Sequence, residues 1–256
     1  MTPREKYSQR PIGHVVEPPE PGAVNLERRV FDTAEIAARQ AATFIAEQAQ
    51  RTVELQGRCV LALSGGETPR QMFKILASEN MPWSMLSVVQ VDERVAPAGD
   101  AARNLALLRE NFLGPSKLLP QQIYPMPVVT TDLNIAARNY AELLEHLCGS
   151  PPVLDLVHLG LGTDGHTASL VPGDPALHVM DADVALTGMY QGHRRMTLTY
   201  PIISRARCIL WLVTGAAKAD ILARLCNDDT TIPAGRVARE RAVVFADQAA
   251  AARLES

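Results

Sequence analysis

The feature that most constrains the fold is a series of short, mostly apolar segments separated by stretches with helical spacing. The four most distinct segments are Cys59–Leu63, Ser87–Val91, Leu154–Leu161 and Cys208–Val213. A strand with one face in water alternates apolar and polar residues, whereas a strand covered on both faces is apolar throughout. The pattern therefore predicts a doubly wound α/β fold in a single Rossmann-like domain, with a mostly parallel sheet and helices on both faces.

The segments around these strands supply the expected helices and boundaries. A short strand at Leu26–Phe31 precedes a long helix, which Asp32 is expected to cap together with Glu35 and Gly57 to end. Further helices are expected at 69–78, 103–113, 132–147 and 216–227, and weaker strands at 196–200 and 243–246. Because residues 1–23 hold five prolines, they are expected to form an extended arm before an α/β domain spanning 24–256.

Composition excludes several classes of protein. The 25 basic and 28 acidic residues give a net charge of −3, without the basic excess expected of a nucleic-acid binder. The longest apolar run, Cys208–Val213, is far too short for a membrane span, and the N-terminus lacks the apolar stretch of a secretory signal. Four scattered cysteines are typical of reduced thiols, so a cytoplasmic location is expected. Oligomeric state is left open.

In a sheet of this kind, ligands bind beyond the carboxyl ends of the strands. After the first strand comes Ser64-Gly65-Gly66-Glu67-Thr68-Pro69, where Thr68 is the expected N-cap and Pro69 the first helical residue. Free amides at Gly65 and Gly66 favour an anion, most naturally a phosphate. An ordinary strand–helix turn is the alternative. The spacings of a Walker loop and of a serine nucleophile elbow are absent.

Two other strand ends carry positive charge. Asp92-Glu93-Arg94 follows the second strand, either as a solvated turn or with Arg94 held by a carboxylate and facing an anionic or carbonyl oxygen. Lys218 follows the fourth strand in the first turn of a helix, where it opposes the helix dipole but suits a phosphate counter-charge. Arg195 is a second candidate, and the sequence does not separate it from Arg194.

The end of the third strand is the most informative. Gly160, Gly162 and Gly165 satisfy the dinucleotide fingerprint, but that fingerprint needs a helix at its third glycine. Three helix breakers follow too soon for such a helix: Pro172, Gly173 and Pro175. The glycines instead suit close approach of the backbone to a ligand. His166, two residues after Asp164, is the best candidate for proton transfer near neutral pH.

The other histidines attract structural interpretations. They are expected on a helix end, in a strand and in loops: His146, His158, His14, His178 and His193. No His-x-x-x-His or His-Glu-x-x-His spacing occurs, so no metal site is expected.

Together these segments resemble the 6-phosphogluconolactonase family, within the fold group that includes glucosamine-6-phosphate isomerase/deaminase. The matching motifs occur in family order: Ser64–Pro69 (S-G-G-x-T-P), Asp92–Arg94 (D-E-R), Gly160–Ser169 (G-x-G-x-D-G-H-T-A-S), Arg195-x-Thr197-Leu198-Thr199 and Gly215-x-x-Lys218. Glu67 and Val171 depart from the usual serine and phenylalanine, which leaves only fine substrate fit in question. The resemblance covers none of residues 1–23.

Two residues favour the lactonase over the deaminase. The deaminase resembles D-G-H-I-A-F-N-E-P, with an acid–base glutamate five residues after the histidine, where this chain has Val171. The deaminase also has D-E-Y where this chain has Arg94 as the third residue. An arginine suits a carbonyl that becomes an oxyanion. A sugar-phosphate-binding module without chemistry is the third alternative, although it would more typically have lost the histidine.

The resemblance implies hydrolysis of 6-phospho-D-glucono-1,5-lactone to 6-phosphogluconate in the oxidative pentose phosphate pathway, with no metal or organic cofactor. The phosphosugar lactone is then the only expected partner, without nucleic acid or membrane. His166 would activate water, with Asp164 fixing its tautomer. Arg94 would stabilise the oxyanion, and Asp92 would hold Arg94. Phosphate-binding residues would be Ser64, Gly65, Gly66, Thr68, Lys218 and Arg195.

Overall fold

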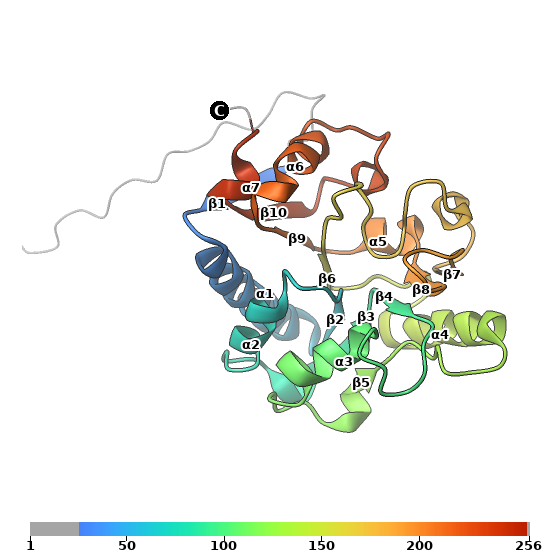
Figure 1. Ribbon diagram of the computed structural model, residues 1–256. Helices are drawn as coiled ribbons and strands as arrows, with labels where there is room; N and C mark the ends of the chain where they lie inside the picture. The colour runs from blue at the N-terminus through green and yellow to red at the C-terminus, as the bar shows by residue number, and fades with distance from the viewer. Residues whose placement is uncertain (1–25, 255–256) are drawn as a thin grey trace, which may run out of the picture.

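A computed structural model describes residues 26–254 and contains a seven-stranded sheet with the order β1-β10-β9-β6-β2-β3-β5 (Figure 1). All neighbouring strands in it are parallel. Its strands are β1 (Glu27–Phe31), β2 (Cys59–Leu63), β3 (Leu86–Gln90), β5 (Ile123–Tyr124), β6 (Leu156–Leu159), β9 (Ile209–Val213) and β10 (Ala242–Asp247). The expected doubly wound α/β class is therefore confirmed.

Helices cover both faces of this sheet, which explains the continuously apolar strands. The α-helices are α1 (Ala34–Gln56), α2 (Arg70–Leu76), α3 (Asn104–Leu108), α4 (Leu133–Cys148), α5 (Tyr200–Arg205), α6 (Ala219–Cys226) and α7 (Gln248–Ala251). Along β2, Val60 packs into the core shared with α4, α5 and α6, whereas Leu61 packs into the core shared with α1 and α2. Each residue of β2 is thus buried on one side of the sheet or the other.

Shorter helical turns connect these elements. They are η1 (Trp83–Met85), η2 (Arg109–Leu113), η3 (Pro120–Gln122), η4 (Pro175–His178), η5 (Ala216–Lys218) and η6 (Pro233–Arg236). Two expected helices are each divided in this way. The segment 103–113 is α3 followed by the π-helical turn η2, and 216–227 is η5 followed by α6.

The helix boundaries are set by the residues that cap each end. Thr33, not Asp32, caps α1: the Thr33 side chain accepts a hydrogen bond from Ile36 N at 3.2 Å. Asp32 instead accepts a hydrogen bond from Gln248, so the expected capping box is wrong by one residue. Gly57 ends α1 with a φ of 74°, as expected. At α4, Asp132 accepts a hydrogen bond from Ile135 N and caps the helix.

A second, antiparallel sheet was not expected from the sequence. It has the order β4-β8-β7, with β4 at Asp92–Arg94, β8 at Arg195–Leu198 and β7 at Val184–Leu186. The segment around 196–200 is therefore not a strand of the parallel sheet, and Asp92–Arg94 is a paired strand rather than a charged turn. The main sheet and the small one meet where β3 runs into β4.

The expected proline-rich arm, residues 1–23, lies outside the described residues, so the boundary at residue 24 stays a prediction. Among residues 26–254, no helix combines the length and apolar character that crossing a membrane requires.

The strand order fixes the place of a binding site. From β2 the chain moves outward through β3 to β5, then returns to place β6 on the other side of β2. Adjacent strands whose connections leave in opposite directions open a crevice at their carboxyl ends. The segments after β2 and β6, both singled out in the sequence, therefore lie beside each other.

Candidate functional site

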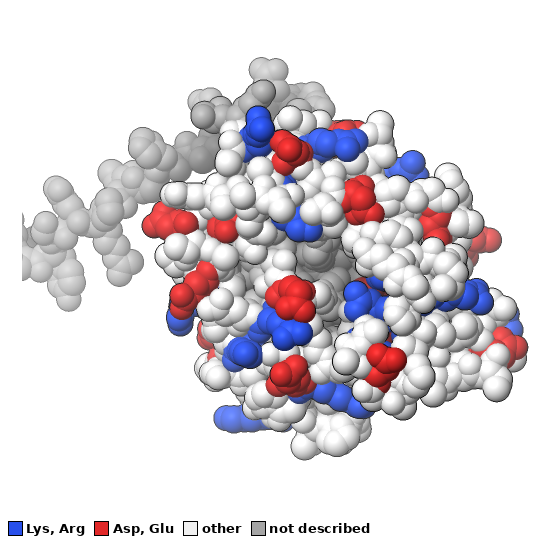
Figure 2. Space-filling model, in the orientation of Figure 1, with Lys and Arg blue, Asp and Glu red and all other residues white. Residues whose placement is uncertain are grey.

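A pocket of about 340 Å³ lies at this crevice. In Figure 2 a hollow lies near the middle of the face seen in Figure 1, with basic and acidic side chains around its rim. Nine of the ten residues predicted for the site line the pocket, and Asp164 lies directly behind His166. The lining residues are Ser64, Gly65, Gly66, Glu67, Thr68, Pro69, Asp92, Arg94, Asn104, Gly160, Leu161, Gly162, His166, Ala168, Arg195 and Lys218.

The loop after β2 forms one wall of the pocket. A Cβ on Gly65 would lie 2.2 Å from Asn104 Oδ1, so only glycine fits there. Gly66 has a φ of 110°, a conformation that favours glycine. Thr68 makes no capping hydrogen bond, and Pro69 precedes α2 as its N-cap. The expected roles of Thr68 as cap and Pro69 as first helical residue are wrong, because the chain turns once more before the helix begins.

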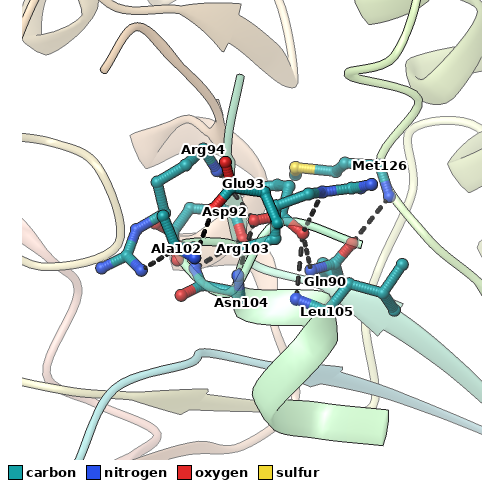
Figure 3. A network of polar contacts seen from close by, with 10 residues as sticks. Gln90, Asp92, Glu93, Arg94, Ala102, Arg103, Asn104, Leu105 and Met126 are labelled. Carbon is teal, nitrogen blue, oxygen red and sulfur yellow. Dashed lines mark hydrogen bonds and ion pairs between the residues drawn. The ribbon is translucent and has the colours of Figure 1, made fainter. Parts of the chain in front are cut away.

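β4 is held by a buried carboxylate, that of Glu93 (Figure 3). Its Oε1 accepts hydrogen bonds from Arg94 N at 2.8 Å and Asn104 N at 2.7 Å. Its Oε2 accepts from Leu105 N at 3.0 Å and from the Gln90 side chain at 3.1 Å. Arg103 Nε lies 3.3 Å from the same oxygen as an ion pair, without hydrogen-bond alignment. Glu93 therefore joins β4 to the start of α3.

Asp92 does not hold Arg94, contrary to the expectation. The Asp92 carboxylate accepts a hydrogen bond from Ser169 Oγ at 2.6 Å, and Arg195 Nη1 lies 3.5 Å from the same hydroxyl. The Arg94 guanidinium instead donates to Ala102 O at 2.6 Å. In a strand, neighbouring side chains point to opposite faces, but Asp92 and Arg94 are two apart and reach different partners on one face.

Arg94 and Arg195 are direct cross-strand partners in the antiparallel pair β4–β8. Like charges in such positions repel each other. Burial and the neighbouring Arg94 lower the pKa of Arg195, which Asp92 partly offsets. The Nε atoms of both arginines are buried without a hydrogen-bond partner in the described part of the chain. Two cations held together this way are suited to binding anionic groups.

The structure also separates the two adjacent arginines. Arg195 is buried and lines the pocket, whereas Arg194 is exposed and donates a long hydrogen bond, 3.4 Å, to Thr187 O. Residues 194 and 195 face opposite sides of the hairpin that leads into β8.

After β6, a tight loop presents His166 to the pocket. Its Nδ1 lies 2.6 Å from Asp164 Oδ1, and Tyr190 donates its hydroxyl hydrogen to Asp164 Oδ2 at 2.8 Å. Burial pushes the pKa of Asp164 up, but the His166 charge and these hydrogen bonds outweigh it, so the pKa lies below its ordinary value. An ionised Asp164 accepts the Nδ1 hydrogen and leaves Nε2 of His166 as the free acceptor.

The glycines of this loop make room for the histidine rather than for a dinucleotide. A Cβ on Gly162 would lie 2.0 Å from His166 Nδ1. Gly162 N also donates a hydrogen bond to His166 O at 2.8 Å, which closes the loop. No helix opens at Gly165; the next helical turn is η4, beginning at Pro175. The rejection of the dinucleotide fingerprint is therefore confirmed.

Lys218 completes the basic lining of the pocket. Its Nζ donates to Leu161 O at 2.6 Å, at the end of the segment that follows β6. Burial lowers the pKa of Lys218, and the Asp164 charge opposes that effect. The pocket thus combines one histidine–carboxylate pair with three cationic side chains: Arg94, Arg195 and Lys218.

Of the other described histidines, none lines the pocket. His158 is completely buried in β6 with its ring edge on Phe73, and among the described residues neither of its ring nitrogens has a hydrogen-bond partner. Within residues 26–254, no three His, Cys, Asp or Glu side chains are placed to hold a metal ion. His14 lies outside the described residues.

Two residues near the site were missed in the sequence. Asn104 lines the pocket, packs on Gly65 and donates to Asp92 O at 3.0 Å. Tyr190 bonds Asp164 from the turn between β7 and β8. Neither belongs to a recognisable motif. The β4–α3 connection brings Asn104 to the site, and the second sheet brings Tyr190 there. Ser169 lay within a quoted motif, but its bond to Asp92 spans 77 residues of sequence.

The arrangement defines a class of protein: a doubly wound α/β protein with a histidine–carboxylate pair and three cationic side chains at a pocket beyond the carboxyl ends of its parallel strands. Such a pocket is suited to a small, anionic substrate with a carbon centre presented to the histidine.

Comparison with known proteins identifies the family. Residues 32–245 match the model of the family described as glucosamine-6-phosphate isomerases/6-phosphogluconolactonase, and this chain belongs to that family. It is 34% identical over 200 residues to a 6-phosphogluconolactonase of Synechocystis sp., covering 77% of this chain and 83% of that protein. It is 32% identical to the 6-phosphogluconolactonase of Rattus norvegicus, covering 91% and 94% of the two chains.

Solved structures agree with this assignment. The 6-phosphogluconolactonase of Trypanosoma brucei superposes with a TM-score of 0.80 at 26% identity, covering 90% of this chain and 99% of that one. A monomeric glucosamine-6-phosphate deaminase superposes with a TM-score of 0.78 at 19% identity, covering 89% of this chain and 100% of the deaminase, which shows the shared fold alone.

Proposed function

We propose that this chain is a 6-phosphogluconolactonase, which hydrolyses 6-phospho-D-glucono-1,5-lactone to 6-phosphogluconate. The carrying observation is the His166–Asp164 pair, 2.6 Å apart, in the same pocket as three cationic side chains. Family membership and the names of the similar proteins support the same activity. The reaction belongs to the oxidative pentose phosphate pathway, and we assign it to the cytoplasm because all four cysteines are free.

His166 acts first as base and then as acid. With Nδ1–H held by Asp164, Nε2 takes a proton from water while the water oxygen bonds to C1 of the lactone. The carbonyl becomes a tetrahedral oxyanion. When this collapses, the bond between C1 and the ring oxygen breaks, and His166 returns the proton to that oxygen. Water is thus added across the ester bond, and the product acid ionises in solution.

Different cationic side chains bind the different negatively charged groups of the substrate. We assign the phosphate to the loop at Ser64–Thr68 together with Lys218 and Arg195. Arg94 holds the developing oxyanion, where one good donor contributes about 3–4 kcal/mol to the transition state. The Arg94–Arg195 pair supports this division, because two adjacent guanidinium groups with unpartnered Nε atoms favour anionic groups between them.

Deamination of glucosamine 6-phosphate is disfavoured by one observation. The position of the acid–base glutamate expected for that reaction is Val171, which is 4% exposed, packs in the protein interior and does not line the pocket. A valine side chain has no ionisable proton, so it cannot act as an acid or a base at this position.

The test of the activity is lactone decay with the spontaneous rate subtracted. The lactone is generated in place and followed with and without protein, and ammonia release from glucosamine 6-phosphate is assayed in parallel. Accelerated decay without ammonia is the expected result. Ammonia without faster decay would replace the lactonase by the deaminase, and no activity in either assay would leave a binding module.

A further inference from the structure

Tyr190 stands behind the pocket without lining it. It begins the turn between β7 and β8, which is closed by hydrogen bonds between the backbones of Tyr190 and His193 at 3.0 and 3.2 Å. Its side chain is half-buried. Since β8 begins at Arg195, the same short turn carries both Tyr190 and one of the pocket's cations.

The hydroxyl of Tyr190 fixes the carboxylate that orients the histidine. It donates to Asp164 Oδ2 at 2.8 Å, while Asp164 Oδ1 lies 2.6 Å from His166 Nδ1. Each carboxylate oxygen therefore has its own partner, which prevents rotation of the group. The two rings meet edge to face, with centroids 5.5 Å apart. Burial and the adjacent Asp164 raise the pKa of Tyr190, so the phenol remains a donor at neutral pH.

The ring of Tyr190 contacts Arg195, one of the cationic side chains that line the pocket. The guanidinium carbon of Arg195 lies 5.0 Å from the ring centroid, within range of a cation–π contact. Gln191 joins the two side chains: its Nε2 donates to Tyr190 Oη at 3.3 Å, and its Oε1 accepts from Arg195 Nη2 at 3.5 Å. One aromatic residue thus touches both the base and a cation of the anion site.

We propose that Tyr190 is a positioning residue with two separable roles, orienting His166 through its hydroxyl and Arg195 through its ring. The inference rests on the proposed lactone hydrolysis, in which those two groups carry the base and the phosphate contact. It goes beyond that proposal because no motif or similarity assigns a role to Tyr190. The other charged groups that face the His166–Asp164 pair are Lys218 and Arg195, and both are kept in the Tyr190 variants.

Two substitutions separate the roles. Tyr190→Phe removes the hydroxyl but keeps the ring, so kcat should fall about 10-fold while KM stays within about two-fold of the parent. Asp164, freed of the phenol donor, holds the protonated imidazole more strongly. The acidic limb of kcat/KM against pH should therefore move upward by about half a unit. Tyr190→Leu also removes the ring and should raise KM about three-fold further.

Tyr124→Phe is the matched control. Tyr124 is also half-buried, but its hydroxyl makes no hydrogen bond within residues 26–254 and it does not line the pocket. This variant should keep the parent constants and pH profile.

A pH profile unchanged in Tyr190→Phe would overturn the inference, and so would equal losses in both Tyr190 variants, which a purely structural role predicts. If the parent protein itself fails to accelerate lactone decay, the proposed function fails instead. The ¹⁵N spectrum of His166 then still decides the inference. The protonation midpoint of the His166 ring nitrogens should lie about half a unit higher in Tyr190→Phe than in the parent, and an unchanged midpoint contradicts the positioning role.

Discussion

Among single residues, close packing and hydrogen bonds fix the positions of the side chains that line the pocket. Gly162 leaves space for His166, and Asn104 occupies the space that a Cβ on Gly65 would need. Lys218 is held on the Leu161 carbonyl. Short, local constraints of this kind keep reacting groups in place before the substrate binds, which lowers the entropic cost of reaching the transition state.

The phosphate assignment is tested at Lys218. Lys218→Met keeps the apolar stem and removes the ammonium, so KM for the phosphorylated lactone should rise about 10-fold or more with little change in kcat. Inorganic phosphate should lose inhibitory strength in parallel. Lys74→Met, on the exposed face of α2, is the control and should match the parent. A lowered kcat with unchanged KM would place Lys218 at the reacting carbon instead.

At the scale of elements, the site depends on how β4 is anchored. The sequence indicated that Asp92–Arg94 mattered, but the role of Glu93 was not foreseen. Its carboxylate accepts four hydrogen bonds and forms one ion pair, and these contacts come from five other residues, including the first residues of α3. These contacts form only when the connection between β4 and α3 folds back and places the start of α3 beside Glu93. No local sequence pattern predicts this fold-back. The contact of Tyr190 with Asp164 could not be predicted for the same reason, because the two residues are 26 apart in the sequence.

Glu93→Gln tests the anchoring of β4. The amide nitrogen of glutamine would face backbone donors that now meet a carboxylate oxygen, so unfolding free energy should fall by about 2–4 kcal/mol. Because Arg94 loses its backbone anchor, kcat should fall as well. Urea unfolding and steady-state kinetics measure the two effects. Glu142→Gln on the exposed face of α4 is the control. Parent-like stability in Glu93→Gln would mean that this network does not hold the strand.

At the scale of the whole molecule, the fold class and the location of the pocket followed from the sequence, whereas the second sheet did not. Continuous apolar runs predicted a sheet covered on both faces, and the strand ends then predicted where the chemistry lies. Each strand of the small sheet has only three or four residues. Pairing of strands this short is decided by tertiary contact, not by periodicity.

The buried His158 ties global stability to pH. Burial lowers its pKa from 6.5 to about 3, so the folded protein keeps it neutral while the unfolded chain takes up a proton below about pH 6.5. Stability should therefore fall as the pH drops from 6.5 toward 3. His158→Leu removes this proton and should reduce the slope by up to about 1.4 kcal/mol per pH unit. Urea unfolding at several pH values measures the slope.

The control for that series is His146→Gln, which changes an exposed histidine at the end of α4 and should keep the parent slope. If His158→Leu also keeps the parent slope, the buried imidazole does not contribute to acid sensitivity.

Whether His166 activates water for lactone hydrolysis is measured with the variant His166→Ala. Turnover above the spontaneous rate should fall by at least about 100-fold, the contribution of a positioned base, while 6-phosphogluconate still binds through the cationic side chains. His178→Ala, an exposed histidine outside the pocket, should keep parent turnover. Near-normal turnover in His166→Ala would show that His166 is not the base.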